Sequence, residues 1–133
     1  MRELDHIGIA VASLDRRLQL YRALGLNATA VEEVVSERVR VAFLPLAGGS
    51  SIELLEPTSS QSAIAAFIAK RGEGLHHLCL RVPDIQAAID ELQACGFELV
   101  GGEPKRGAHG SLVCFVHPRS TGGVLIELSQ AQG

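Results

Sequence analysis

Aromatic residues are scarce in this sequence, which has no tryptophan, one tyrosine and four phenylalanines in 133 residues. Hydrophobic residues still make up 47% of the chain, so we expect a core built mainly from aliphatic side chains. A chain of this length can bury roughly two-thirds of the surface that its unfolded form exposes. We therefore predict that residues 1–133 form a single domain.

Long apolar runs and dense basic clusters are also missing. No hydrophobic segment approaches the ~20 residues of a membrane span, and the first residues lead into a strand-like segment rather than a signal peptide. The 12 basic and 15 acidic residues give a formal charge of −3, with no basic stripe for nucleic acid. We predict a soluble, cytoplasmic protein that binds neither membranes nor nucleic acids.

Cysteine is rare as well. Cys79, Cys95 and Cys114 are odd in number and show no C-x-x-C spacing, so neither a disulfide framework nor a thiolate zinc site is indicated. We expect three small, reduced packing residues.

What the sequence does contain is an internal repeat. The segment 6–11 (HIGIAV) is similar to 77–82 (HLCLRV), and each is followed by a helical pattern of apolar residues. The two patterns end at Gly25 and Gly96, each nineteen positions after its histidine, where glycine suits a left-handed helix cap.

A second repeated motif, Gly-Gly-x-x-Ile-Glu-Leu, places a glutamate late in each half. Glu53 follows His6 by 47 positions, and Glu127 follows His77 by 50. This order and spacing predict a tandem duplication. The expected parts are the copies 1–58 and 74–130 and a short helical linker over 59–73.

Each copy predicts the element order strand, helix, strand, strand, strand. In the first copy we expect these elements at 5–11, 14–24, 29–34, 38–46 and 50–56. In the second copy we expect them at 76–82, 84–95, 98–101, 111–117 and 123–129. An amphipathic helix over 62–71 joins the copies. The predicted fold class is α+β, with tandem βαβββ modules that form a curled mixed sheet around a metal site.

The metal site is predicted from the repeated histidines and glutamates. Strand alternation places His6, Glu53, His77 and Glu127 on the face that does not pack against the helices. Alone, each would be typical of a surface or capping residue; repeated at equivalent positions, they suit a pseudo-twofold ion site. Two imidazoles and two carboxylates favour first-row metals over calcium, and they leave coordination positions open.

Paired modules with these residues resemble the vicinal oxygen chelate superfamily, which includes glyoxalase I, extradiol dioxygenases, fosfomycin-resistance proteins and methylmalonyl-CoA epimerases. Over nearly the whole chain the motifs are similar to those of the epimerases. These motifs are DHIGIAV (5–11), IELLEP (52–57), GEGLHH (72–77), EP (103–104), GAHG (107–110), HP (117–118) and GVLIEL (123–128). The four-residue ligand pattern is shared with glyoxalase I, whereas the double histidine, GAHG and HP motifs are more specific to the epimerases.

The resemblance implies interconversion of (2R)- and (2S)-methylmalonyl-CoA. The C2 hydrogen lies between a thioester and a carboxylate, and chelation of both oxygens stabilises the enolate that remains when the proton leaves. One divalent ion per chain is implied, with Co²⁺ favoured and Ni²⁺, Mn²⁺ or Zn²⁺ as alternatives. Glu127 matches a family residue that both binds the ion and moves the proton.

One position departs from the family pattern. Some bacterial epimerases have a second, non-ligating glutamate where this chain has Val41, which cannot carry a proton. Glu37 shares strand parity with Val41 and is a candidate replacement.

Several other polar residues have two interpretations each. His76 is expected to hydrogen-bond at the start of a strand, and His117 before proline is expected to stabilise a turn. His109 in its glycine-flanked loop suits either a substrate contact or a plain loop. Lys105 and Arg106 are solvated loop charges or contacts to the phosphates of CoA.

Two other functions stay open from the sequence. Glyoxalase I would use the same ion and similar proton chemistry on a glutathione hemithioacetal, and a metal-free binding module would use the same fold without catalysis. We expect an acyl-CoA substrate and a homodimer, since symmetric dimers are the commonest oligomers.

Overall fold

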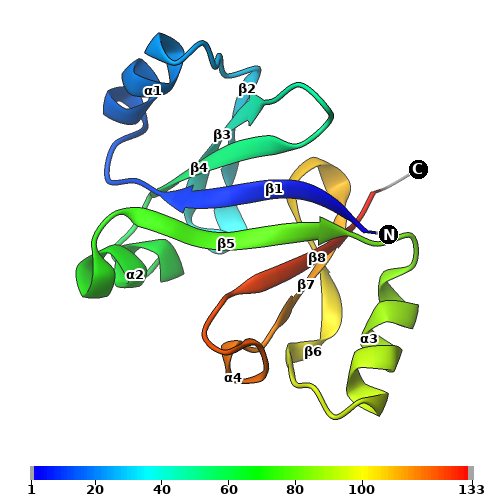
Figure 1. Ribbon diagram of the computed structural model, residues 1–133. Helices are drawn as coiled ribbons and strands as arrows, with labels where there is room; N and C mark the ends of the chain where they lie inside the picture. The colour runs from blue at the N-terminus through cyan, green and yellow to red at the C-terminus, as the bar shows by residue number, and fades with distance from the viewer. Residues whose placement is uncertain (1, 132–133) are drawn as a thin grey trace. The chain divides into compact units, whose positions relative to one another are not determined.

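The computed structural model describes residues 2–131 and contains two compact units (Figure 1). The N-terminal unit consists of residues 6–76, and the C-terminal unit consists of the residues up to Asp5 together with those from His77 onward. Each module has the predicted βαβββ order, which confirms the α+β class, while the duplication of 1–58 as 74–130 stays a prediction.

The first module contains a mixed sheet with the strand order β2-β3-β4-β1. Strands β1 and β4 are parallel, and the other neighbouring pairs are antiparallel. The elements are β1 (Glu3–Ala10), α1 (Leu14–Ala23), β2 (Ala30–Val34), a 3₁₀ turn (Val35–Glu37), β3 (Val39–Pro45) and β4 (Ser51–Pro57), followed by the linking helix α2 (Ala63–Arg71).

The second module repeats this arrangement with the strand order β5-β8-β7-β6. Strands β5 and β8 are parallel, and the other neighbouring pairs are antiparallel. The elements are β5 (Gly74–Arg81), α3 (Ile85–Ala94), β6 (Leu99–Arg106), a 3₁₀ turn (Ala108–Gly110), β7 (Leu112–Val116), α4 (Pro118–Thr121) and β8 (Ile126–Gln130).

The two main helices begin and end in the same way. The side chains of Ser13 and Asp84 accept hydrogen bonds from backbone N–H groups in the first turn of α1 and α3, which is the usual N-cap arrangement. Gly25 and Gly96 follow the helices with φ of 89° and 86°, a conformation that glycine adopts without steric cost. Both glycines therefore end the helices as predicted.

Each unit has its own aliphatic core between its helix and one face of its sheet. In the N-terminal unit the buried core cluster contains Val11, Leu14, Ala42, Leu44 and Leu54. In the C-terminal unit the corresponding cluster contains Val82, Ile85, Ile89, Cys114 and Leu128. The prediction of a core with few aromatic residues is confirmed.

The second module differs from the prediction at two places. Strand β6 reaches Arg106 rather than ending at 101, and its pairing with β7 shifts register between Val100 and Lys105. Gly101 and Gly102 have φ of 79° and 74°, so this irregularity is a glycine-dependent bulge.

The second difference is the short helix α4, which the sequence did not indicate. Its N-cap is His117, Pro118 occupies its first turn, and Gly122 ends it in the left-handed conformation. Strand β8 therefore begins at Ile126 rather than at 123.

The start of β1 belongs to the C-terminal unit through an arginine clasp. Arg81 donates from Nε to Asp5 Oδ1 at 2.7 Å and from Nη1 to Glu3 Oε2 at 2.9 Å. The hydrogen bond to Asp5 is the largest cause of the raised pKa of Arg81. The negative charge of Asp5, and the hydrogen bond and charge of Glu3, act in the same direction.

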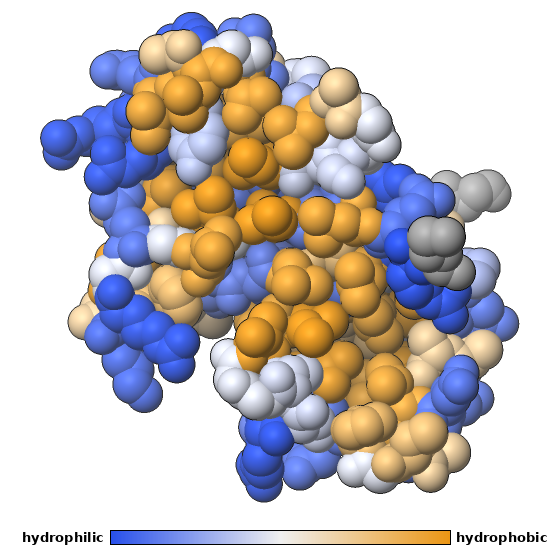
Figure 2. Space-filling model, in the orientation of Figure 1, coloured by the Kyte–Doolittle hydropathy of each residue, from blue (hydrophilic) through white to orange (hydrophobic). Residues whose placement is uncertain are grey.

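Apolar side chains also reach the surface. Figure 2 shows such a group over α1, where Leu20 and Leu24 are 50% and 65% exposed. The homodimer stays a prediction.

Among residues 2–131 no helix is long and apolar enough to cross a membrane.

Candidate functional site

The first predicted ligand pair lies within the N-terminal unit. His6 is on β1 and Glu53 is on the parallel strand β4, where Glu53 stands opposite Gly8. The Nδ1 atom of His6 lies 3.0 Å from Oε2 of Glu53, and the two side chains are 8% and 11% exposed. A carboxylate this deeply buried needs a hydrogen-bond donor or a cation beside it, and the imidazole occupies that place.

The second pair lies within the C-terminal unit. His77 is on β5 and Glu127 is on the parallel strand β8, where Glu127 stands opposite Cys79. The Nε2 atom of His77 lies 3.2 Å from Oε1 of Glu127, and the side chains are 7% and 11% exposed. The structure therefore brings each predicted histidine to its predicted glutamate.

The surroundings of the two pairs correspond as well. In both units the glutamate stands opposite the small residue two positions after the histidine, and it stands opposite a phenylalanine on its antiparallel neighbour. The phenylalanines are Phe43 and Phe115, and the ring of Phe115 meets His77 edge-on with centroids 6.0 Å apart. The duplicated sequence has built the same local site twice.

The faces are those that strand alternation predicts. Leu54 and Leu128, the residues that follow the two glutamates, are both in the helix-side cores. Glu53 and Glu127 consequently point to the other face of their sheets. Each pair offers one imidazole and one carboxylate with little exposure to water, a donor chemistry that suits first-row divalent ions.

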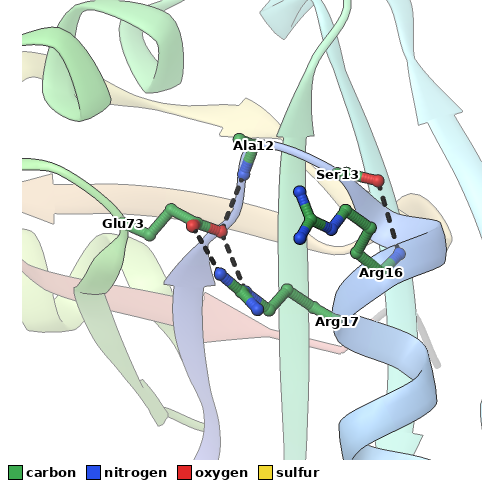
Figure 3. Close-up of a pocket in the computed structure, with 5 residues that line it drawn as sticks. All are labelled: Ala12, Ser13, Arg16, Arg17 and Glu73. Atoms are coloured by element: carbon green, nitrogen blue, oxygen red, sulfur yellow. Dashed lines mark hydrogen bonds and ion pairs between the residues drawn. The ribbon is translucent and has the colours of Figure 1, made fainter.

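A separate small pocket lies at the start of α1 (Figure 3). It is lined by Ala12, Ser13, Arg16, Arg17 and Glu73. Oε1 of Glu73 accepts a hydrogen bond from the backbone N–H of Ala12 at 3.0 Å and one from Nε of Arg17 at 3.1 Å, and Oε2 accepts from Nη2 of Arg17 at 2.8 Å. Hydrogen bonds from Arg17 and then from Ala12 hold the pKa of Glu73 below its usual value. Glu73, which immediately precedes β5, thus connects the start of β5 to the first turn of α1.

The role of Glu73 was not visible in the sequence. It appeared only as part of the GEGLHH motif, and its bonding partners are 56 and 61 positions away. No local pattern reports contacts of that range.

The remaining histidines have separate positions. His117 caps α4, where its Nδ1 accepts a hydrogen bond from the N–H of Arg119 at 3.0 Å, so the predicted turn role is confirmed. His76 packs its ring edge-on against Phe67 at 4.9 Å. His109 has a left-handed backbone with φ of 58°, which is uncommon outside glycine. A substrate contact by His109 stays a prediction.

Two predictions about other polar residues were wrong in their structural premise. Glu37 is not on a strand: it is exposed in the 3₁₀ turn, and β3 begins only at Val39, after Arg38 with φ of 53°. The left-handed residue breaks the alternation, so Glu37 does not share parity with Val41. Lys105 and Arg106 lie on β6 rather than in a loop.

Two of the three cysteines are packing residues as predicted, whereas the prediction was wrong for Cys95, which is exposed. Cys79 and Cys114 are buried and Cys95 is exposed at the end of α3. Burial raises the pKa of the Cys114 thiol to about 11, and the nearby charge of Glu127 acts in the same direction.

Comparison with known proteins gives matches over most of the chain. Residues 5–115 match the family described as the glyoxalase/bleomycin resistance protein/dioxygenase superfamily. The ethylmalonyl-CoA/methylmalonyl-CoA epimerase of Cereibacter sphaeroides is 42% identical, with 96% of each chain covered. The uncharacterized protein YqjC of Bacillus subtilis is 38% identical, with 100% of this chain and 95% of that protein covered.

A solved structure is similar over almost its full length. It is a variant of Streptomyces coelicolor methylmalonyl-CoA epimerase in complex with 2-nitronate-propionyl-CoA. The TM-score is 0.91 at 36% identity, and 98% of this chain and 95% of that chain are covered.

Proposed function

Because the chain belongs to the glyoxalase/bleomycin resistance protein/dioxygenase superfamily, we propose that it is an enzyme that interconverts (2R)- and (2S)-methylmalonyl-CoA. The observation that carries this proposal is the duplicated, buried His–Glu pair. The similarity to relatives named as epimerases of ethylmalonyl-CoA and methylmalonyl-CoA supports the choice of substrate. The reaction moves one proton at C2 of an acyl-CoA.

We propose further that the two pairs together hold one divalent ion, with His6, Glu53, His77 and Glu127 as its ligands. The donor chemistry fits: two neutral imidazoles and two carboxylates satisfy a borderline cation, and their burial limits competition by water. Co²⁺ is the expected ion, with Ni²⁺, Mn²⁺ or Zn²⁺ as alternatives. When bound, it would supply Lewis-acid stabilisation of the negative charge on the enolate.

Glu127 is the proposed proton carrier. Its carboxylate oxygen takes the proton from C2, and the electron pair of the broken C–H bond is delocalised into the thioester as an enolate. Return of a proton to the opposite face of C2 gives the other epimer. The low exposure of Glu127, 11% for its side chain, keeps this transfer away from bulk water.

The test is exchange of the C2 hydrogen of methylmalonyl-CoA in D₂O, with and without added Co²⁺, followed by NMR or mass spectrometry. We expect Co²⁺-dependent exchange and interconversion of the epimers. Turnover of the methylglyoxal–glutathione hemithioacetal without C2 exchange would indicate glyoxalase I instead. Absence of both activities, with no metal retained after gentle purification, would indicate a binding module.

A further inference from the structure

Glu32 on β2 lies on the same sheet face as the Glu53 carboxylate. It stands directly opposite Val41 of β3, which stands opposite Leu55 of β4. Residues that stand opposite each other on antiparallel strands point to the same face, and Leu55 shares its face with Glu53, two positions earlier. This places Glu32 directly beside Val41, the position at which some bacterial epimerases have a glutamate.

The neighbouring Glu33 provides the contrast. It stands opposite Arg40, on the other face of the sheet, and it is exposed, whereas Glu32 is half-buried. Arg40 pairs with Glu56 at 3.0 Å on that other face. The two adjacent glutamates therefore have different surroundings, and only Glu32 belongs to the face that carries His6 and Glu53.

The offset between Glu32 and Glu53 on this face follows from sheet geometry. Strands lie ~4.8 Å apart and each residue advances ~3.4 Å, so the backbone of Glu32 is roughly 10 Å across the sheet and 7 Å along it from Glu53.

We propose that Glu32 is the second proton-transfer residue of the site, a proposal that rests on the proposed epimerase function. Inversion at C2 needs one group that removes a proton from one face and another that returns a proton to the opposite face. In this proposal Glu127 removes the proton from one face of C2 and the Glu32 carboxylic acid donates its proton to the opposite face, where the enolate electron pair forms the new C–H bond. The reverse reaction starts with the Glu32 carboxylate, and solvent restores both groups.

The experiment compares Glu32→Gln with the matched control Glu33→Gln. Deuterium incorporation and change of configuration are measured separately, starting from each epimer under Co²⁺ saturation. For Glu32→Gln we expect interconversion to fall by ~10²-fold or more, the scale of general acid–base catalysis. Exchange should persist, with retained configuration, in the epimer whose hydrogen faces Glu127. Metal content and Tm should match the control.

This split between exchange and inversion separates proton transfer from a structural role. Equal rates of interconversion in Glu32→Gln and Glu33→Gln would overturn the proposal. A Glu32→Gln protein that loses C2 exchange from both epimers and also loses its bound metal would overturn it as well. The wild-type protein tests the parent proposal in the same assay, because wild type without exchange would remove the epimerase function itself. Glu32→Asp keeps a carboxylate and should restore part of the inversion.

Discussion

The Oε2 atom of Glu56 accepts a hydrogen bond from the backbone N–H of Leu14 at 2.8 Å, joining the end of β4 to the first residue of α1. The C-terminal unit repeats this bond with Gln130, whose Oε1 accepts from the N–H of Ile85 at 2.8 Å. Each acceptor comes three positions after a predicted ligand glutamate. In each unit the strand with the glutamate is thus fixed to the helix that follows the histidine strand.

Loss of this bond should reduce stability. Replacing Gln130 with alanine leaves the first N–H of α3 without its side-chain acceptor, so we expect a loss of about 1 kcal/mol. For a domain of this size that corresponds to a Tm lower by about 4 °C. The control is Gln86→Ala on the surface of α3, where only an exposed bond to Asp90 is lost. Thermal denaturation giving equal shifts for both variants would contradict the prediction.

The two histidines of the repeated pairs should each be required for tight metal binding. His6→Ala and His77→Ala remove one coordinate bond and leave the partner carboxylate without its neighbour, so we expect loss of bound metal in both. His76→Ala is the matched control, because His76 packs on Phe67 and should leave metal content unchanged. The measurement is elemental analysis of each purified protein after incubation with Co²⁺. Full occupancy in either site variant would exclude that histidine as a ligand.

Glu127 is expected to do more than bind the ion. Glu127→Gln keeps the size and one oxygen donor but cannot accept a proton. If only metal affinity were lost, excess Co²⁺ would restore the rate of C2 exchange. We expect the rate to stay ~10²-fold or more below wild type at metal saturation. The check is exchange from each epimer as a function of Co²⁺ concentration, and recovery to the wild-type rate from both would assign the proton to another residue.

The Glu73 contacts predict a specific pH dependence of stability. The folded pKa of Glu73 is lowered, so its charged form favours folding. This contribution is fully present above the unfolded pKa and disappears as the pH falls through the lower, folded value. Glu73→Gln should therefore be less stable than wild type at neutral pH, and the difference should shrink in acid. Urea denaturation across this range measures it, with Glu91→Gln, which removes an exposed carboxylate of α3, as the matched control.

The sequence predicted the site best where the strands of both copies alternate between apolar and polar residues. The faces of Glu53 and Glu127 follow from period-two strands and from the apolar residues beside them. The register between β2 and β3 does not follow in this way, because the 3₁₀ turn and the left-handed Arg38 reset the phase between the two strands. The sequence therefore favoured Glu37 as the candidate second proton-transfer residue and did not point to Glu32.

The arginine clasp has a consequence for how the chain is made. Glu3 and Asp5 leave the ribosome 78 and 76 positions before Arg81, the residue that binds them. The C-terminal unit therefore has to recover a piece of chain synthesised before the whole N-terminal unit. A substitution at Glu3 or Asp5 therefore acts on the C-terminal unit, although the whole N-terminal unit separates these residues from Arg81 along the chain.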